Sequence, residues 1–199
     1  MKSNICKIED GVKDLAAIFK ECERVAEYNG FTDKQALQLR LICEELDGML
    51  PNIIDDFEGT LWIEYEGGVC KVKASIRIPD FNTEKKSELI AVAKNKKNSA
   101  AVGVTGKIRD AIENFFLDEA AVEPFDASNT FFHLSTGYSE GVDYSYIWSL
   151  EQYKTTVSQD EKTEEWDELE KSVIAAASDD VIVGVKGKQA DIVIVKKIK

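Results

Sequence analysis

LRLICEELDGM at residues 39–49, followed by LWIEYEGGVC at residues 61–70, is the most informative part of this 199-residue chain. In and just beyond the first segment, apolar residues recur every three or four positions, which predicts a helix with one buried face: Leu39, Ile42, Cys43, Leu46, Met49 and Leu50. Thr32 and Gln35 have the spacing of a capping box, so we expect the helix to begin there. Pro51 favours an end or a kink near Leu50, because its ring removes a backbone donor.

The second segment predicts a β-hairpin. Leu61, Ile63 and Tyr65 alternate with other residues before Gly67-Gly68, a pair that accepts the positive φ angles of a tight turn. Beyond the turn, every second residue is again apolar: Cys70, Val72, Ala74, Ile76 and Ile78. This pattern is typical of a sheet with one packed face and one polar face.

A second amphipathic helix precedes this unit. Its apolar stripe consists of Val12, Leu15, Phe19, Cys22, Val25 and Ala26, and Gly30 can end it as a left-handed cap. Two helices laid on the apolar face of the hairpin give an α/β fold. We therefore expect a two-layer sandwich with the helices packed on one face of a mixed, largely antiparallel sheet.

Further elements are expected along the rest of the chain. Between the hairpin and residue 155 we expect helices at 84–93 and 104–116 and strands at 130–135 and 143–150, the last with Tyr144, Tyr146, Trp148 and Leu150 on one face. We assign residues 1–155 to an α/β domain. Residues 156–199 are expected to form a helix plus β-hairpin integrated into the same sheet.

The C-terminal segment has its own pattern. Thr163 is the expected N-cap of a helix whose buried stripe includes Trp166, Leu169, Val173 and Ala177. Strands follow at about 181–185 and 191–196, and the second is apolar on both faces, which is typical of a central strand. Two arrangements stay open: the segment is an appendage, or it completes the core sheet and residues 103–150 are an insertion.

Composition and charge limit the possible functions. The chain is 44% hydrophobic and 31% charged, as expected for a globular protein. No apolar run approaches the ~18 residues of a membrane span and the N-terminus lacks an apolar secretion segment, so we expect a cytoplasmic protein. Its net charge of −12 opposes binding to nucleic acid or anionic membrane. A basic stretch is either solvated surface or a site for an anion or acidic partner: Lys85, Lys86, Lys94, Lys96, Lys97, Lys107 and Arg109.

The cysteines and the histidine suggest no metal or triad chemistry. Cys6, Cys22, Cys43 and Cys70 are widely spaced and form no CxxC pair, and His133 is the one histidine. We expect reduced structural thiols, no zinc site and no catalytic triad.

The acidic helix, loop and hairpin resemble the nucleotide-binding half of the histidine-kinase-like (GHKL) ATPases, and within them the anti-sigma-factor serine kinases. In that family a helix bears a Glu-Leu-x-x-Asn motif, whose glutamate is a general base and whose asparagine binds magnesium. The segment 45–49 has this spacing, so the resemblance puts Glu45 at the base position and Met49 at the metal position. A thioether is a poor ligand for magnesium, which prefers oxygen.

Two other motifs of the family have partial counterparts. Its adenine-binding aspartate motif matches residues 76–82 in two frames: one puts Ile76 at the aspartate position, and the other uses Asp80 without the following glycines. The glycine turn that wraps the phosphates resembles residues 102–112. There the resemblance implies Gly103, Gly106 and Lys107 as nucleotide-binding residues at a helix N-terminus.

The resemblance and these substitutions predict a degenerate GHKL-like regulatory protein, with weak or no ATP binding and no cofactor. It would act by contact with a protein such as a sigma factor or its antagonist, and whether it is a homodimer stays open. One alternative is an active ATP-dependent protein serine kinase that uses magnesium, variant ligands and Glu45 as catalytic base. Another alternative is an unrelated α/β binding module.

Overall fold

The computed structural model describes residues 1–12, 15–54, 56–77, 103–117, 146–157, 172–186 and 188–198. Its elements, in chain order, are β1 (Cys6–Glu9), α1 (Leu15–Tyr28), α2 (Asp33–Ile53), β2 (Glu58–Glu66), β3 (Val69–Arg77), α4 (Gly103–Leu117), β4 (Tyr146–Ser149), α6 (Leu150–Val157), α8 (Val173–Ala177), β5 (Asp180–Lys186) and β6 (Gln189–Lys197). None of the described helices is long and apolar enough to cross a membrane.

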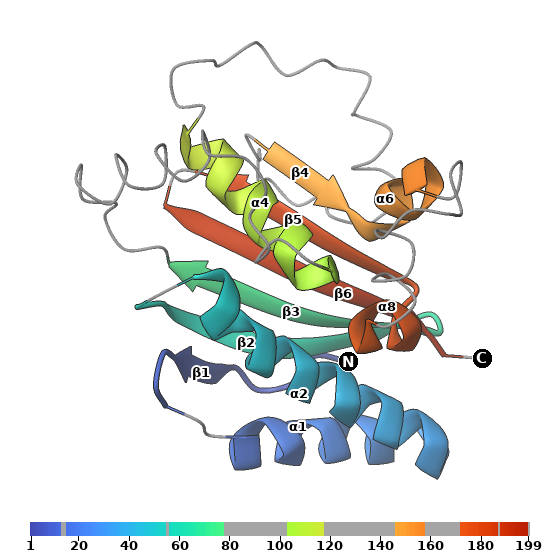
Figure 1. Cartoon of the computed structure of the whole chain (residues 1–199). Helices are drawn as coiled ribbons and strands as arrows, with labels where there is room; N and C mark the ends of the chain where they lie inside the picture. Colours follow the sequence, from blue (N-terminus) through green and yellow to red (C-terminus); the bar gives the residue numbers. More distant parts are fainter. Residues whose placement is uncertain are drawn as a thin grey trace.

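In the described part of the chain, six strands form one sheet in the order β1-β2-β3-β6-β5-β4 (Figure 1). All five pairings between neighbouring strands are antiparallel. Strand β6 lies between β3 and β5, so the prediction of a central strand near residues 191–196 is confirmed. The C-terminal hairpin therefore belongs to the same sheet as the first hairpin, whereas the division of the chain at residue 155 stays a prediction.

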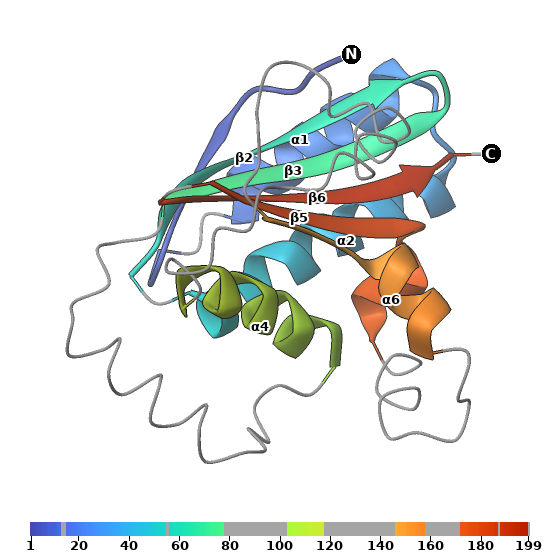
Figure 2. The same cartoon turned by 90° about the horizontal axis from the view of Figure 1, so that it is seen from above.

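The helices cover one face of this sheet. In Figure 1, α2 and α4 lie side by side in front of the strands, and Figure 2 shows both on the same side of β3, β6 and β5. Helix α1 packs against α2 and against β2 at one end of the sheet. Buried residues of α1, α2, α4 and α8 join the inward-facing strand residues in one hydrophobic cluster. The predicted α/β two-layer fold is confirmed.

Local signals correctly predicted several boundaries. Thr32 accepts a hydrogen bond from the backbone N–H of Gln35, and the Gln35 side chain accepts one from the N–H of Thr32, which completes the capping box of α2. Gly67 and Gly68 have φ angles of 57° and 81° in the turn between β2 and β3. Both angles lie where glycine avoids the steric cost of a Cβ atom.

Two helix boundaries near the N-terminus differ from the prediction. Val12 is 56% exposed and its N–H donates to the carbonyl of Glu9, so it closes a turn after β1 and does not join the stripe of α1. Helix α2 does not end at Leu50 but continues through Pro51 to Ile53, whereas the alternative of a kink near Leu50 stays a prediction. Ile53 and the following Ile54 are buried, and we attribute the extra turn to this burial.

Two further boundaries differ in the second half of the chain. Leu150 does not extend a strand but opens α6, because the carboxylate of Asp180 accepts the N–H of Glu151 at 2.9 Å and Ser149 accepts that of Gln152 at 3.4 Å. Val173 is not buried but 44% exposed, since α8 begins there with Ser172 as its N-cap. The predicted elements at 84–93 and 130–135, the N-cap Thr163 and His133 lie outside the described residues.

Candidate functional site

Helix α2 holds the predicted base and the position implied for magnesium binding. Glu45 is partly exposed, between the exposed Glu44 and the fully buried Leu46. One turn later Met49 is only 6% exposed and belongs to the hydrophobic cluster. The Met49 side chain is therefore packed among apolar residues, and its thioether is a poor ligand for magnesium.

In one of the two frames, the position implied for adenine recognition is Ile76 on β3, which belongs to the same hydrophobic cluster as Met49. Ile76 is 0% exposed, and its Cα partners are Gly59 on β2 and Ala190 on β6. Adding a Cβ atom at Gly59 would bring it within 2.5 Å of the Ser75 carbonyl oxygen, so the strands are closely packed here. In the frame that starts at Ile76, the aspartate position is thus a core position. Asp80, the candidate of the other frame, lies outside the described residues.

The glycine turn predicted to hold phosphates is the start of α4. Gly103 has a φ angle of 78°, and Gly106 is buried in the first turn of the helix. The ammonium group of Lys107 lies 5.5 Å from the centre of the Tyr153 ring on α6. Since α2 and α4 pack together, the structure brings the helix of Glu45 beside the helix that carries Gly103, Gly106 and Lys107 (Figure 1).

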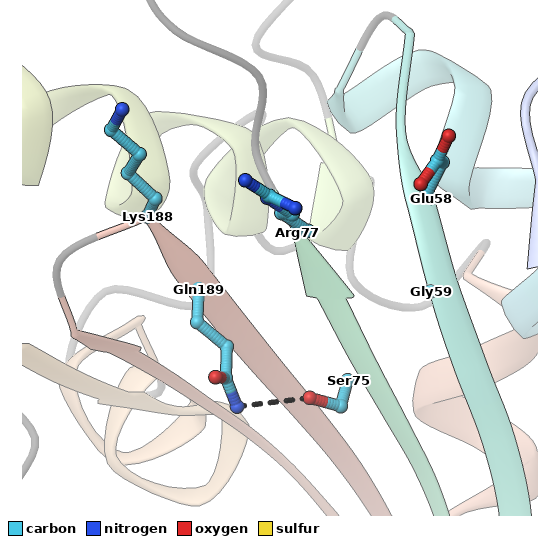
Figure 3. A pocket seen from close by; sticks show the side chains of 6 residues that line it. All are labelled: Glu58, Gly59, Ser75, Arg77, Lys188 and Gln189. Carbon is cyan, nitrogen blue, oxygen red and sulfur yellow. Dashed lines mark hydrogen bonds between the residues drawn. The ribbon is translucent and has the colours of Figure 1, made fainter.

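A depression that the sequence analysis missed lies on the other side of the sheet. It has a volume of about 380 Å³ and is lined by residues from the ends of β2, β3 and β6: Glu58, Gly59, Ser75, Arg77, Lys188 and Gln189 (Figure 3). Arg77 is the Cα partner of both Glu58 and Gln189, so the strand register brings these side chains together. The Gln189 amide donates to Ser75 Oγ at 3.0 Å. The lining contains both acidic and basic side chains, Glu58, Arg77 and Lys188, so the depression is suited to binding a polar ligand.

A group of polar contacts occupies the same face farther along β2 and β3. The carboxylate of Glu64 accepts hydrogen bonds from Lys73 at 2.6 Å and from the Trp62 indole N–H at 2.8 Å, and Lys2 lies 3.5 Å away. Lys2 also lies 5.0 Å from the centre of the Trp62 ring. Burial by itself raises the pKa of Glu64, but the bonds from Lys73 and Trp62 outweigh it, so the pKa lies below its ordinary value.

In the part of the chain that the structure describes, no group of three or more His, Cys, Asp or Glu side chains is arranged to hold a metal ion. Comparisons with protein-family models, with curated proteins and with solved structures find no match for the chain.

Proposed function

We propose that this chain is a degenerate GHKL-like regulatory protein that acts by contact with another protein and binds ATP weakly or not at all. The order of its N-terminal elements supports the resemblance: two helices, of which the second carries Glu45, precede the β2–β3 hairpin. Both helices pack against the hairpin or against each other on one side of the sheet. The predicted layering of this unit is the feature on which the resemblance rests.

One observation carries the loss of ATP chemistry. Met49, which the resemblance puts at the metal position, and Ile76, which one of the two frames puts at the adenine position, are both buried in the hydrophobic cluster. A thioether does not replace an oxygen ligand of magnesium. An isoleucine cannot accept a hydrogen bond from the adenine amino group, so a base placed there would lose its polar partner.

The charge of the chain favours a basic partner surface. Its net charge of −12 raises the rate of encounter with cationic proteins and opposes binding to nucleic acid. We propose bacterial cytoplasmic signalling as the setting and a sigma factor or its antagonist as the partner. A second copy of the chain is the alternative partner in this proposal.

Calorimetric titration of the full chain with Mg-ATP and with Mg-ADP tests the loss of nucleotide binding. We expect no saturable heat at nucleotide concentrations up to about 1 mM, since affinity weaker than that corresponds to under ~4 kcal/mol of binding free energy. A dissociation constant in the micromolar range for either nucleotide would overturn the proposal.

The rival function, an ATP-dependent protein serine kinase, is favoured by one specific feature. Glu45 is partly exposed on α2, and the neighbouring α4 opens on Gly103 with a positive φ angle. In that case Glu45→Ala abolishes phosphoryl transfer and leaves thermal stability nearly unchanged, while Glu44→Ala, one residue away and exposed, retains transfer. Transfer that survives in Glu45→Ala rules out this kinase mechanism.

A further inference from the structure

All four cysteines of the chain are buried and come from four different elements. Cys6 lies on β1, Cys22 on α1, Cys43 on α2 and Cys70 on β3. The electrostatic surroundings of Cys43 include each of the other three thiols. Cysteines spread over the first 70 positions of the sequence therefore belong to one cluster of the core, between helices α1 and α2 and strands β1 and β3.

Within this group, Cys22 and Cys43 are in direct contact. The sulfur atoms of Cys22 and Cys43 are 3.3 Å apart, and these residues are 2% and 0% exposed. The two residues are 21 positions apart in the sequence, on two helices that pack against each other. A disulfide requires a sulfur separation of ~2.05 Å, so the two sulfur atoms would have to move about 1.3 Å closer.

We propose that Cys22 and Cys43 are a site of reversible covalent modification, at which a small-molecule disulfide oxidises the pair to an intrachain bond between α1 and α2. The Cys22 thiolate attacks one sulfur of the oxidant, whose S–S bond breaks and releases one thiolate. Cys43 then attacks the Cys22 sulfur of this mixed disulfide, and the second small thiolate leaves. Two protons pass from the cysteines to the leaving thiolates, and the oxidant takes up two electrons. This inference does not depend on the proposed function.

A shared metal ion explains the pair less well. Two sulfurs bound to one tetrahedral zinc at ~2.3 Å lie roughly 3.8 Å apart, and a structural site needs four ligands. Among the described residues, no third ligand is placed to complete such a site. A direct bond between the two sulfurs needs no additional ligand.

Burial makes the reaction depend on opening of the fold. The hydrogen bond with Cys22, together with burial, raises the pKa of Cys43 well above 9.0, so little of the reactive thiolate exists in the closed protein. Helix α1 is the outer helix of the pair, beyond α2 at the β1 end of the sheet (Figure 1). Local separation of α1 would admit the oxidant, and reclosing would bring the two sulfurs together.

The bond would stabilise the chain because it closes a loop that the unfolded protein otherwise samples freely. For residues 21 positions apart, the restriction is expected to raise the midpoint of thermal unfolding by roughly 5–10 °C. A midpoint that does not rise on oxidation would contradict this part of the inference.

The experiment exposes the reduced full chain, under native conditions, to excess oxidised glutathione. Remaining thiols are then labelled with N-ethylmaleimide in denaturant that contains a chelator, so that metal binding cannot protect them. We expect the number of labels to fall from four to two, with Cys6 and Cys70 labelled, Cys22 linked to Cys43 in the peptide map, and full reversal by dithiothreitol. The double variant Cys6→Ala/Cys70→Ala is expected to fall from two labels to none.

Matched variants separate the proposed pair from general oxidation. Cys22→Ala is expected to form no intrachain disulfide, and the Cys6→Ala/Cys70→Ala protein keeps the test valid if Cys22→Ala does not fold. Four labels on the treated wild-type protein would overturn the proposal. So would a bond that joins Cys43 to Cys6 or Cys70.

Discussion

The two faces of the β2–β3 hairpin are built from alternate residues of the same strands, yet they hold different kinds of interaction. Toward the helices, Ile63, Val72 and Ile76 are at most 1% exposed. On the other face, Glu64 and Lys73 form an ion pair in partial contact with solvent. Because removal of apolar area from water contributes more than a partly exposed ion pair does, the helix-covered face carries most of the stability.

The same contrast bears on function. Met49, at the position that the resemblance links to metal, and Ile76, at the adenine position in one of its two frames, lie on the helix-covered side, where both are buried among apolar residues. The polar groups that remain accessible, such as Arg77 and Glu58, lie on the opposite face (Figure 3). Binding through these groups would use the exposed face of the sheet.

The largest difference in the free energy of unfolding is expected between substitutions at two neighbouring residues that lie on opposite faces of β3. Ile76→Ala removes a fully buried side chain and should lower the free energy of unfolding by about 2–5 kcal/mol. Arg77→Ala, on the exposed face of the same strand, should change it by no more than about 0.5 kcal/mol. Urea unfolding followed by circular dichroism measures both values. Similar losses in the two variants would break the contrast between the faces.

Much of the fold could be predicted because its signals are local. The capping box of Thr32 and Gln35 and the Gly67-Gly68 turn each depend on a few adjacent residues. Pro51 did not predict the end of α2 correctly, because the burial of Ile53 depends on distant packing partners that no local pattern contains. The exposure of Val173 was missed for a related reason, since the N-cap at Ser172 breaks the apparent stripe.

The candidate site was less predictable than the fold. The spacing of Glu45 and Met49 is visible in the sequence, whereas the contact of Cys22 with Cys43 depends on how α1 and α2 pack. The depression near Arg77 depends on the register of three strands, one of which begins more than a hundred residues after the others end. Cross-strand partners of this kind cannot be paired before the order of strands is known.

An intermediate change in stability is expected when a glycine of the sheet, Gly59, or a glycine of the helix layer, Gly48, is replaced by alanine. In Gly59→Ala the new Cβ atom would lie 2.5 Å from the Ser75 carbonyl oxygen, so β2 and β3 would have to separate at a cost of about 1–3 kcal/mol. Gly48→Ala on α2 meets no atom within 4 Å and should instead stabilise the helix by about 0.5–1 kcal/mol. Thermal unfolding of the two variants shows whether each substitution raises or lowers the stability. If Gly59→Ala leaves the stability unchanged, the close approach of β2 and β3 at this position does not constrain the sheet.

The smallest effect is expected from the ion pair on the opposite face. Glu64→Gln keeps the size of the side chain but removes its charge, and should cost about 0.5–1 kcal/mol at pH 7, because the site is partly exposed and screened by solvent. The pKa of Glu64 in the folded protein lies below the ordinary value of 4.5, so the folded protein binds fewer protons than the unfolded chain in the pH range between the two values. The contribution of the charge is therefore fully present above pH 4.5 and disappears as the pH falls through the lower, folded pKa.

Urea unfolding of wild type and variant over a pH series should show a constant difference from pH 7 to about 5, which then shrinks in more acidic solution. Glu66→Gln, an exposed change on the same strand, is the control and should give no such loss. A difference for Glu64→Gln that persists unchanged to the most acidic pH would mean that its cost comes from altered packing and not from the charge.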